Sequence, residues 1–82
     1  MNFEGNEFAS KGVGAALQER FQEEVADCKK YRELAQEARK EGHLEMARIL
    51  DRISKDEHSH AYVLVRYLED TDTNKRLWES IK

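Results

Sequence analysis

The sequence contains no proline, one cysteine and only four glycines among its 82 residues. Proline and glycine are the strongest helix breakers, so their scarcity allows long uninterrupted helices and argues against a β-sandwich. The lone Cys28 excludes an internal disulfide, a zinc ribbon and an iron site built from four cysteines of one chain. These absences favour a helical fold without covalent cross-links.

Long apolar runs and blocks of like charge are also missing. The longest apolar run is too short to cross a bilayer, and the first four residues do not resemble a signal peptide, so we expect a cytoplasmic protein without membrane contact. Acids and bases are interleaved at a net charge of −3, which gives no indication of nucleic-acid binding. The chain forms one domain at most, close to the size at which a single core only just holds a fold.

The residues that are present predict an all-α fold, an antiparallel two-helix hairpin followed by a short C-terminal helix. Residues 1–12 show no sustained period and are expected to be an irregular lead-in. Good helix formers then occupy 13–41, and Gly42 follows as the expected stop. A second breaker-free stretch covers 43–70, and residues 74–81 are expected to form the short third helix.

Both long stretches carry a seam of residues at alternating steps of four and three, a pattern typical of antiparallel bundles. In the first stretch the seam is Leu17, Phe21, Glu24, Cys28, Tyr31, Ala35 and Ala38. In the second it is Met46, Leu50, Ile53, Glu57, His60, Leu64 and Tyr67. The ionisable exceptions of interest are Glu24, Glu57 and His60, because a buried carboxylate is strongly unfavourable unless a cation or a hydrogen-bond partner meets it.

The position of Gly42 places these three residues at a similar height in the hairpin. Glu24 lies 18 positions before Gly42, while Glu57 and His60 lie 15 and 18 positions after it. Residues equally far from the turn of an antiparallel pair lie side by side. At about 1.5 Å of rise per residue, the three side chains therefore fall within about one helical turn of each other.

Glu57 and His60 form a Glu-x-x-His step, which places both side chains on one helix face. Di-metal sites in helix bundles use one such step from each of two helices and a lone Glu from each of the other two. One hairpin supplies half of this set, so we expect a second copy to complete a four-helix bundle, in even multiples of the chain. Carboxylates and imidazole suit iron, with manganese as the other candidate. The motif is weak alone, and a metal-free dimerisation hairpin with buried Glu–His contacts is the alternative.

Residues 20–68 also resemble the first helical hairpin of rubrerythrin-type proteins of the ferritin-like superfamily. The resemblance rests on the run Glu24–Tyr31, the pair Leu34-Ala35, Ala38, the Glu41-Gly42 turn, Ala47 and the run Asp56–Ala61. The separation of 33 positions between Glu24 and Glu57 makes it more specific than the short motif. By resemblance, the metal ligands and catalytic residues would be Glu24, Glu57 and His60, with Glu57 as the bridging carboxylate.

The resemblance implies a ferroxidase that oxidises Fe(II) with O2 or peroxide, in iron storage or oxidative-stress protection. A full rubrerythrin has a second hairpin and a rubredoxin domain with four cysteines, and this sequence contains neither. A rubrerythrin-like peroxidase, the other alternative, would therefore need an external electron donor. Half-bundle chains are also similar to encapsulated ferritins, which build their site between subunits, so an encapsulin-type shell is a further expected partner.

Four more residues can be assigned from their spacing. Tyr31, one seam step beyond Cys28, either donates a hydrogen bond to a ligand carboxylate or is an ordinary core aromatic. Cys28 is expected to be a packed thiol near the site. His58 is one position off the seam and is expected to face solvent, whereas Trp78 is expected to make a packing contact.

Overall fold

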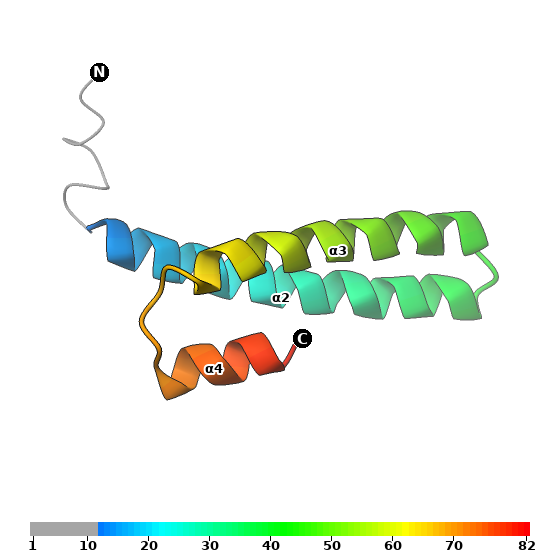
Figure 1. Cartoon of the computed structure of the whole chain (residues 1–82). Helices are drawn as coiled ribbons and strands as arrows, with labels where there is room; N and C mark the ends of the chain where they lie inside the picture. Colours follow the sequence, from blue (N-terminus) through cyan, green and yellow to red (C-terminus); the bar gives the residue numbers. More distant parts are fainter. Residues whose placement is uncertain (1–11) are drawn as a thin grey trace, which may run out of the picture.

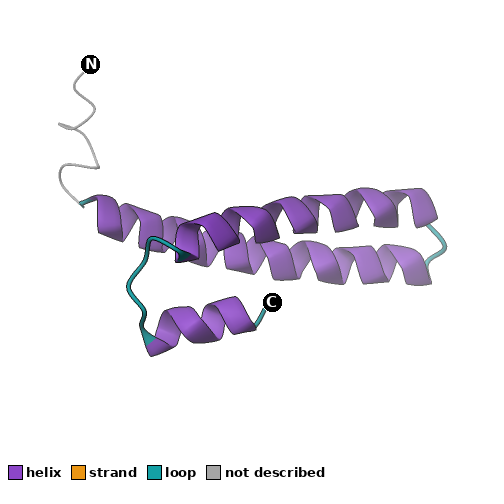
Figure 2. Ribbon diagram, viewed as in Figure 1, coloured by secondary structure: helices purple, strands orange, loops and turns teal. Residues whose placement is uncertain are grey.

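The computed structural model describes residues 12–82, which form three helices (Figure 1). Helix α2 spans Val13–Lys40, α3 spans Leu44–Val65 and α4 spans Asp72–Glu79. The two long helices lie side by side and antiparallel, and α4 lies beside the half of the hairpin far from its turn. None of the described residues is in a strand (Figure 2), so the all-α class is confirmed. Among these helices we find none that combines the length and the apolar character of a membrane span.

The hairpin turn forms where the sequence predicts it. After α2 ends at Lys40, Gly42 takes a φ of 84°, a left-handed conformation that favours glycine. The Gly42 amide donates to the Arg39 carbonyl at 3.1 Å, and the His43 amide donates to the Ala38 carbonyl at 2.8 Å. These bonds satisfy carbonyls that the end of α2 would otherwise leave without a partner. The expected lead-in, apart from Gly12, lies outside the described residues.

The predicted bounds of the last two helices differ from those observed. Helix α3 ends at Val65, five residues before the predicted end at Asp70, and α4 begins at Asp72, two residues before the predicted start at 74. Thr71 explains the earlier start, because its extended backbone and its Oγ1 cap the helix, accepting a hydrogen bond from the Asn74 amide at 3.1 Å.

Asn74 explains why the chain leaves the direction of α3. It is only 2 % exposed, and its side chain exchanges two hydrogen bonds with that of Gln18, at 2.6 and 3.0 Å. Its Nδ2 also donates to the Glu69 carbonyl at 3.0 Å. The start of α4 is therefore tied back to α2, a long-range contact that a helical period cannot reveal.

The Thr71 cap can be tested directly. Replacing Thr71 by alanine is expected to lower the free energy of unfolding by about 1 kcal/mol, since a donor at the start of α4 loses its partner. Urea unfolding followed by circular dichroism measures this change. Thr73→Ala is the matched control, because Thr73 is exposed inside the same helix and does not cap it. An equal loss from both variants would contradict the assignment.

The hydrophobic core lies between α4 and the hairpin. Its fully buried members are Phe21, Val25, Cys28, Ala61 and Ile81. Partly buried residues pack against them: Leu64, Val65, Leu68, Leu77 and Trp78. Leu77 and Trp78 of α4 and Ile81, which follows it, pack into this core, so α4 covers one side of the hairpin and leaves the other side uncovered.

The seam of α2 is observed largely as predicted, but that of α3 is partly wrong. Met46 and Tyr67 were expected to be seam residues, yet they are 51 % and 75 % exposed. The buried positions of α3 are instead Ala47, Ser54 and Ala61, seven residues apart. Their small side chains let α3 approach α2 closely, which rotates the larger apolar residues outward.

This rotation creates an apolar surface on the side of the hairpin away from α4, which we call the open face. Its exposed apolar members are Leu34 on α2, Met46, Ile49 and Val63 on α3, and Tyr67 just after the end of α3. On α3 these residues recur at helical spacing, so they share one stripe. An apolar stripe of this length on an 82-residue protein is typical of an interaction surface.

Candidate metal centre

Glu24 from α2 and Glu57 and His60 from α3 come together beside the open face. One ligand atom from each lies within 4.8 Å of the others. Nδ1 of His60 lies 3.3 Å from Oε1 of Glu57 and 3.5 Å from Oε2 of Glu24. Glu24 and His60 are equally far from the hairpin turn and therefore lie at the same height. Glu57 and His60 are three positions apart on α3 and therefore share one helix face.

Exposure increases across the cluster in the order Glu24, Glu57, His60. The side chains are 3 %, 20 % and 58 % exposed, respectively. A hollow of about 350 Å³ reaches the cluster from the open face, lined by Arg20, Glu24, His60, Val63 and Leu64. A small ion can therefore reach a buried carboxylate past an accessible imidazole.

The two oxygens of Glu24 have different surroundings. Oε2 forms an ion pair with Nη2 of Arg20 at 2.8 Å. Oε1 is buried and has no hydrogen-bond partner among the described residues. A buried carboxylate oxygen without a partner is costly, and a coordinated cation would remove that cost. Two carboxylates and an imidazole are also a donor set suited to iron or manganese, so the residues present fit a metal ion.

Glu57 shows the electrostatic consequence of this arrangement. Its pKa is raised above the usual 4.5 by a hydrogen bond with Glu24, by burial and by the charge of Glu24, while His60 acts in the opposite direction. Two carboxylates held together without a cation favour a proton on one of them. The raised pKa therefore reports an arrangement that a positive ion would relieve.

The raised pKa gives a prediction for the metal-free protein. A carboxyl group whose pKa is higher in the folded than in the unfolded state favours folding at low pH, and this contribution is lost as the pH rises through the folded-state value. Glu57→Gln should therefore melt at a higher temperature than the wild type at pH 7, and the difference should shrink as the pH falls toward 4.5. Melting curves of chelator-treated protein measure it, and a difference that does not depend on pH would contradict it.

Two of the other candidate residues do not join the cluster. Tyr31 is half-buried, and within the described part of the chain no hydrogen bond links its hydroxyl to Glu24, Glu57 or His60. Its predicted supporting role stays a prediction. Cys28 is fully buried, with its Sγ 3.6 Å from Oγ of Ser54 and its carbonyl accepting from the same hydroxyl at 3.0 Å. It therefore lies in the packed interface between the two long helices.

The expectation that His58 faces solvent is wrong. His58 is half-buried, and its ring centroid lies 4.9 Å from that of Trp78. Tyr62 approaches the same indole at 5.8 Å. The side chain of His58, one position off the seam, points toward α4 rather than toward solvent, because α4 covers this side of the hairpin. Trp78 makes the expected packing contact.

Arg20 contacts the cluster, although it belongs to neither predicted seam. It lies outside the apolar seam, at an exposed position of α2, so the hydrophobic pattern does not indicate it. A spacing of four residues before Glu24 is the signal that could have found it, because residues at that spacing are neighbours on a helix.

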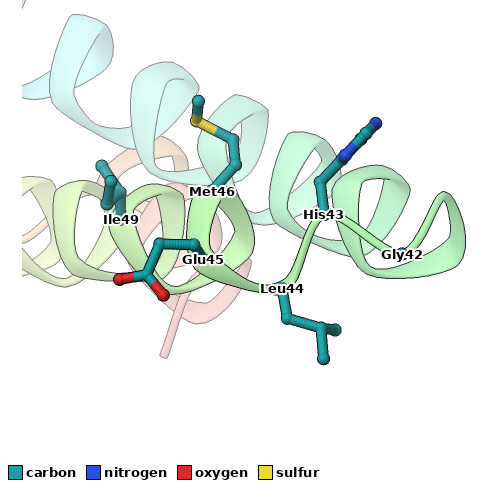
Figure 3. A pocket seen from close by; sticks show the side chains of 6 residues that line it. All are labelled: Gly42, His43, Leu44, Glu45, Met46 and Ile49. Carbon is teal, nitrogen blue, oxygen red and sulfur yellow. The ribbon is translucent and has the colours of Figure 1, made fainter.

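A second hollow, of about 630 Å³, lies at the hairpin turn and has a different character. Its lining residues are Gly42, His43, Leu44, Glu45, Met46 and Ile49. Figure 3 shows that the side chains of His43 and Glu45 point away from each other, and so do those of Leu44 and Met46. Without converging polar groups, this hollow does not form a chemical site.

Comparison with known proteins gives a family match. The chain matches the family model for rubrerythrin over residues 16–81. This range contains the three clustered residues and also α4, so it extends beyond the hairpin over which the sequence shows its resemblance. Searches of curated proteins and of solved structures gave no match.

Proposed function

The chain belongs to the rubrerythrin family, whose members are ferritin-like di-iron proteins, and from this premise we propose that it is a ferroxidase. It would oxidise Fe(II) with O2 or peroxide at a site formed by Glu24, Glu57 and His60. The observation that carries the proposal is the buried Oε1 of Glu24, which has no partner among the described residues, beside a second carboxylate and an accessible imidazole. Such a group of ligands is costly without a cation and favourable with one.

We propose further that a second copy of the chain completes the site. One hairpin offers two carboxylates and one imidazole, whereas a di-iron site in a helix bundle uses four carboxylates and two imidazoles. His60 is 58 % exposed on the open face, which leaves it available to a metal ion shared with a partner.

The open face supports a second copy as the occupant. Exposed apolar residues lie on both sides of His60, with Met46 and Ile49 toward the hairpin turn and Val63 and Tyr67, the latter just beyond α3, toward the other end. Pairing two open faces would bury both stripes and bring the two sets of ligands together. This is the four-helix bundle expected from the sequence. The expected association with an encapsulin-type shell stays a prediction.

In the proposed reaction each residue has a distinct task. Two bound irons supply the electron transfer to O2 or peroxide. Glu24 and Glu57 bind and neutralise the cations, and Glu57, whose pKa is raised, gives up its proton when a cation takes that place. His60 offers a nitrogen at the accessible side of the site. Val63 and Leu64 line the approach and limit water around the carboxylates.

Iron loading tests the proposed function. Protein purified without chelators and titrated with Fe(II) under anaerobic conditions is expected to bind about one iron per chain, or two per dimer. Adding O2 or hydrogen peroxide should then oxidise the bound iron, which absorbance spectroscopy follows. Failure to retain iron after loading would contradict the proposal and favour the metal-free dimerisation hairpin.

A further inference from the structure

Arg20 is the charged neighbour of the proposed metal site on α2. Its Nη2 lies 2.8 Å from Oε2 of Glu24, and its Nη1 lies 3.6 Å from Oε1 of Glu23. The Arg20 side chain is 60 % exposed, whereas that of Glu24 is 3 % exposed. A guanidinium that is largely accessible to solvent therefore contacts a carboxylate that is buried in the protein.

Arg20 and His60 approach the same oxygen of Glu24. Nδ1 of His60 lies 3.5 Å from Oε2, the atom that also contacts the guanidinium. Arg20 and His60 also line the same hollow on the open face. A cation that used both oxygens of Glu24, the unpartnered Oε1 and the Oε2 that faces His60, would therefore compete with Arg20 for Oε2.

The charges of Glu24, Glu57 and Arg20 also favour displacement of Arg20 by a cation. Glu24 and Glu57 together carry a charge of −2 when both are ionised, which one divalent cation neutralises. Arg20 would then be a surplus positive charge beside the metal, and like charges at this distance repel. Its exposure allows it to turn away at small cost, and the neighbouring Glu23 carboxylate is 66 % exposed and available to receive it.

We propose that Arg20 is a displaceable counter-ion of the metal site. In the metal-free protein it neutralises part of the charge of Glu24, and on metal uptake it is released toward Glu23 and solvent. The inference rests on the proposed metal site and adds to it a residue that sets the affinity. Arg20 thus opposes metal binding while stabilising the metal-free fold.

The test is the affinity for Co(II), a divalent probe that air oxidises far less readily than Fe(II), measured by calorimetric titration. Arg20→Gln is expected to bind Co(II) about twofold to fivefold more tightly than the wild type, the range that exposed ion pairs give. The metal-free variant is expected to melt at a lower temperature. Arg20→Lys keeps the charge but lacks the fork of the guanidinium, so its affinity should lie between the two.

Arg48→Gln is the matched control. Arg48 forms an ion pair with Glu45 at 3.1 Å, and both side chains are exposed on α3. The control therefore removes one positive charge at a position outside the site and should leave the affinity for Co(II) unchanged. If Arg20→Gln does not fold without metal, Arg20→Lys decides by the same comparison. Equal or weaker binding by the Arg20 variants would overturn the inference and make Arg20 a residue that positions Glu24 in the loaded site. A wild type that binds no Co(II) and no Fe(II) would overturn the proposed function as well.

Discussion

Replacing Glu57 by alanine is expected to abolish Fe(II) oxidation and to leave the hairpin folded. The variant loses a carboxylate of the cluster, and losing a ligand should reduce the oxidation rate by more than the roughly 10- to 100-fold typical of supporting residues. Without metal the same change removes one of two interacting carboxylates, so the free energy of unfolding should stay the same or rise. Iron oxidation followed by absorbance, together with a melting curve, measures both effects.

Glu45→Ala provides the matched control for that experiment. Glu45 lies on the same helix with its side chain 85 % exposed, so its removal changes the net charge equally without touching the cluster. His60→Ala extends the series, because it leaves both carboxylates in place and should cause a partial loss of metal occupancy. Wild-type oxidation by the Glu57 variant would remove Glu57 from the proposed site.

Metal is also expected to strengthen assembly of the chain. If each hairpin supplies Glu24, Glu57 and His60, every metal ion needs ligands from two chains, and binding that exists only in the assembled state stabilises that state. At a metal concentration one hundredfold above the dissociation constant, the stabilisation is about 2.7 kcal/mol per independent site. Solution mass and melting temperature, followed against added Fe(II) under anaerobic conditions, should both rise.

The control for assembly is Glu24→Ala, which removes the most buried ligand of the cluster. Its mass and melting temperature should not respond to Fe(II), although the apolar open face is unchanged. Full metal binding by a stable monomer would contradict the shared site, even with the ligands correctly identified. A metal-independent dimer would show instead that the open face alone drives association.

The cluster of Glu24, Glu57 and His60 could be predicted because it depends on local geometry. Helical rise and period are constant, and Gly42 fixes where the chain reverses, so counting positions from the turn gives the height of each side chain. The spacing of Arg20 from Glu24 follows the same rule. The hydrophobic pattern does not indicate Arg20, because an exposed arginine contributes nothing to it. Only the proximity of Arg20 to a buried carboxylate indicates its role.

The rotation of α3 could not be predicted in the same way. Ala47, Ser54 and Ala61 contribute little hydrophobic signal, whereas Met46 and Tyr67 contribute much. The close approach of two helices depends on the sizes of both facing surfaces, and small residues decide it by leaving room. Hydrophobic periodicity measures which side is apolar, and in α3 the apolar side is wider than the contact with α2.

The sequence by itself determined the helical class, the hairpin turn at Gly42 and the convergence of two glutamates and a histidine. All three follow from backbone propensities and from distances along a single helix or across one turn. Only the tertiary structure decided where α3 ends, which side α4 covers and which apolar residues remain exposed beside His60. These depend on contacts between residues far apart in sequence, such as the 56-residue separation of Gln18 and Asn74. The physical reason is that packing energy depends on both contacting surfaces, so the sequence of one helix does not determine how that helix packs.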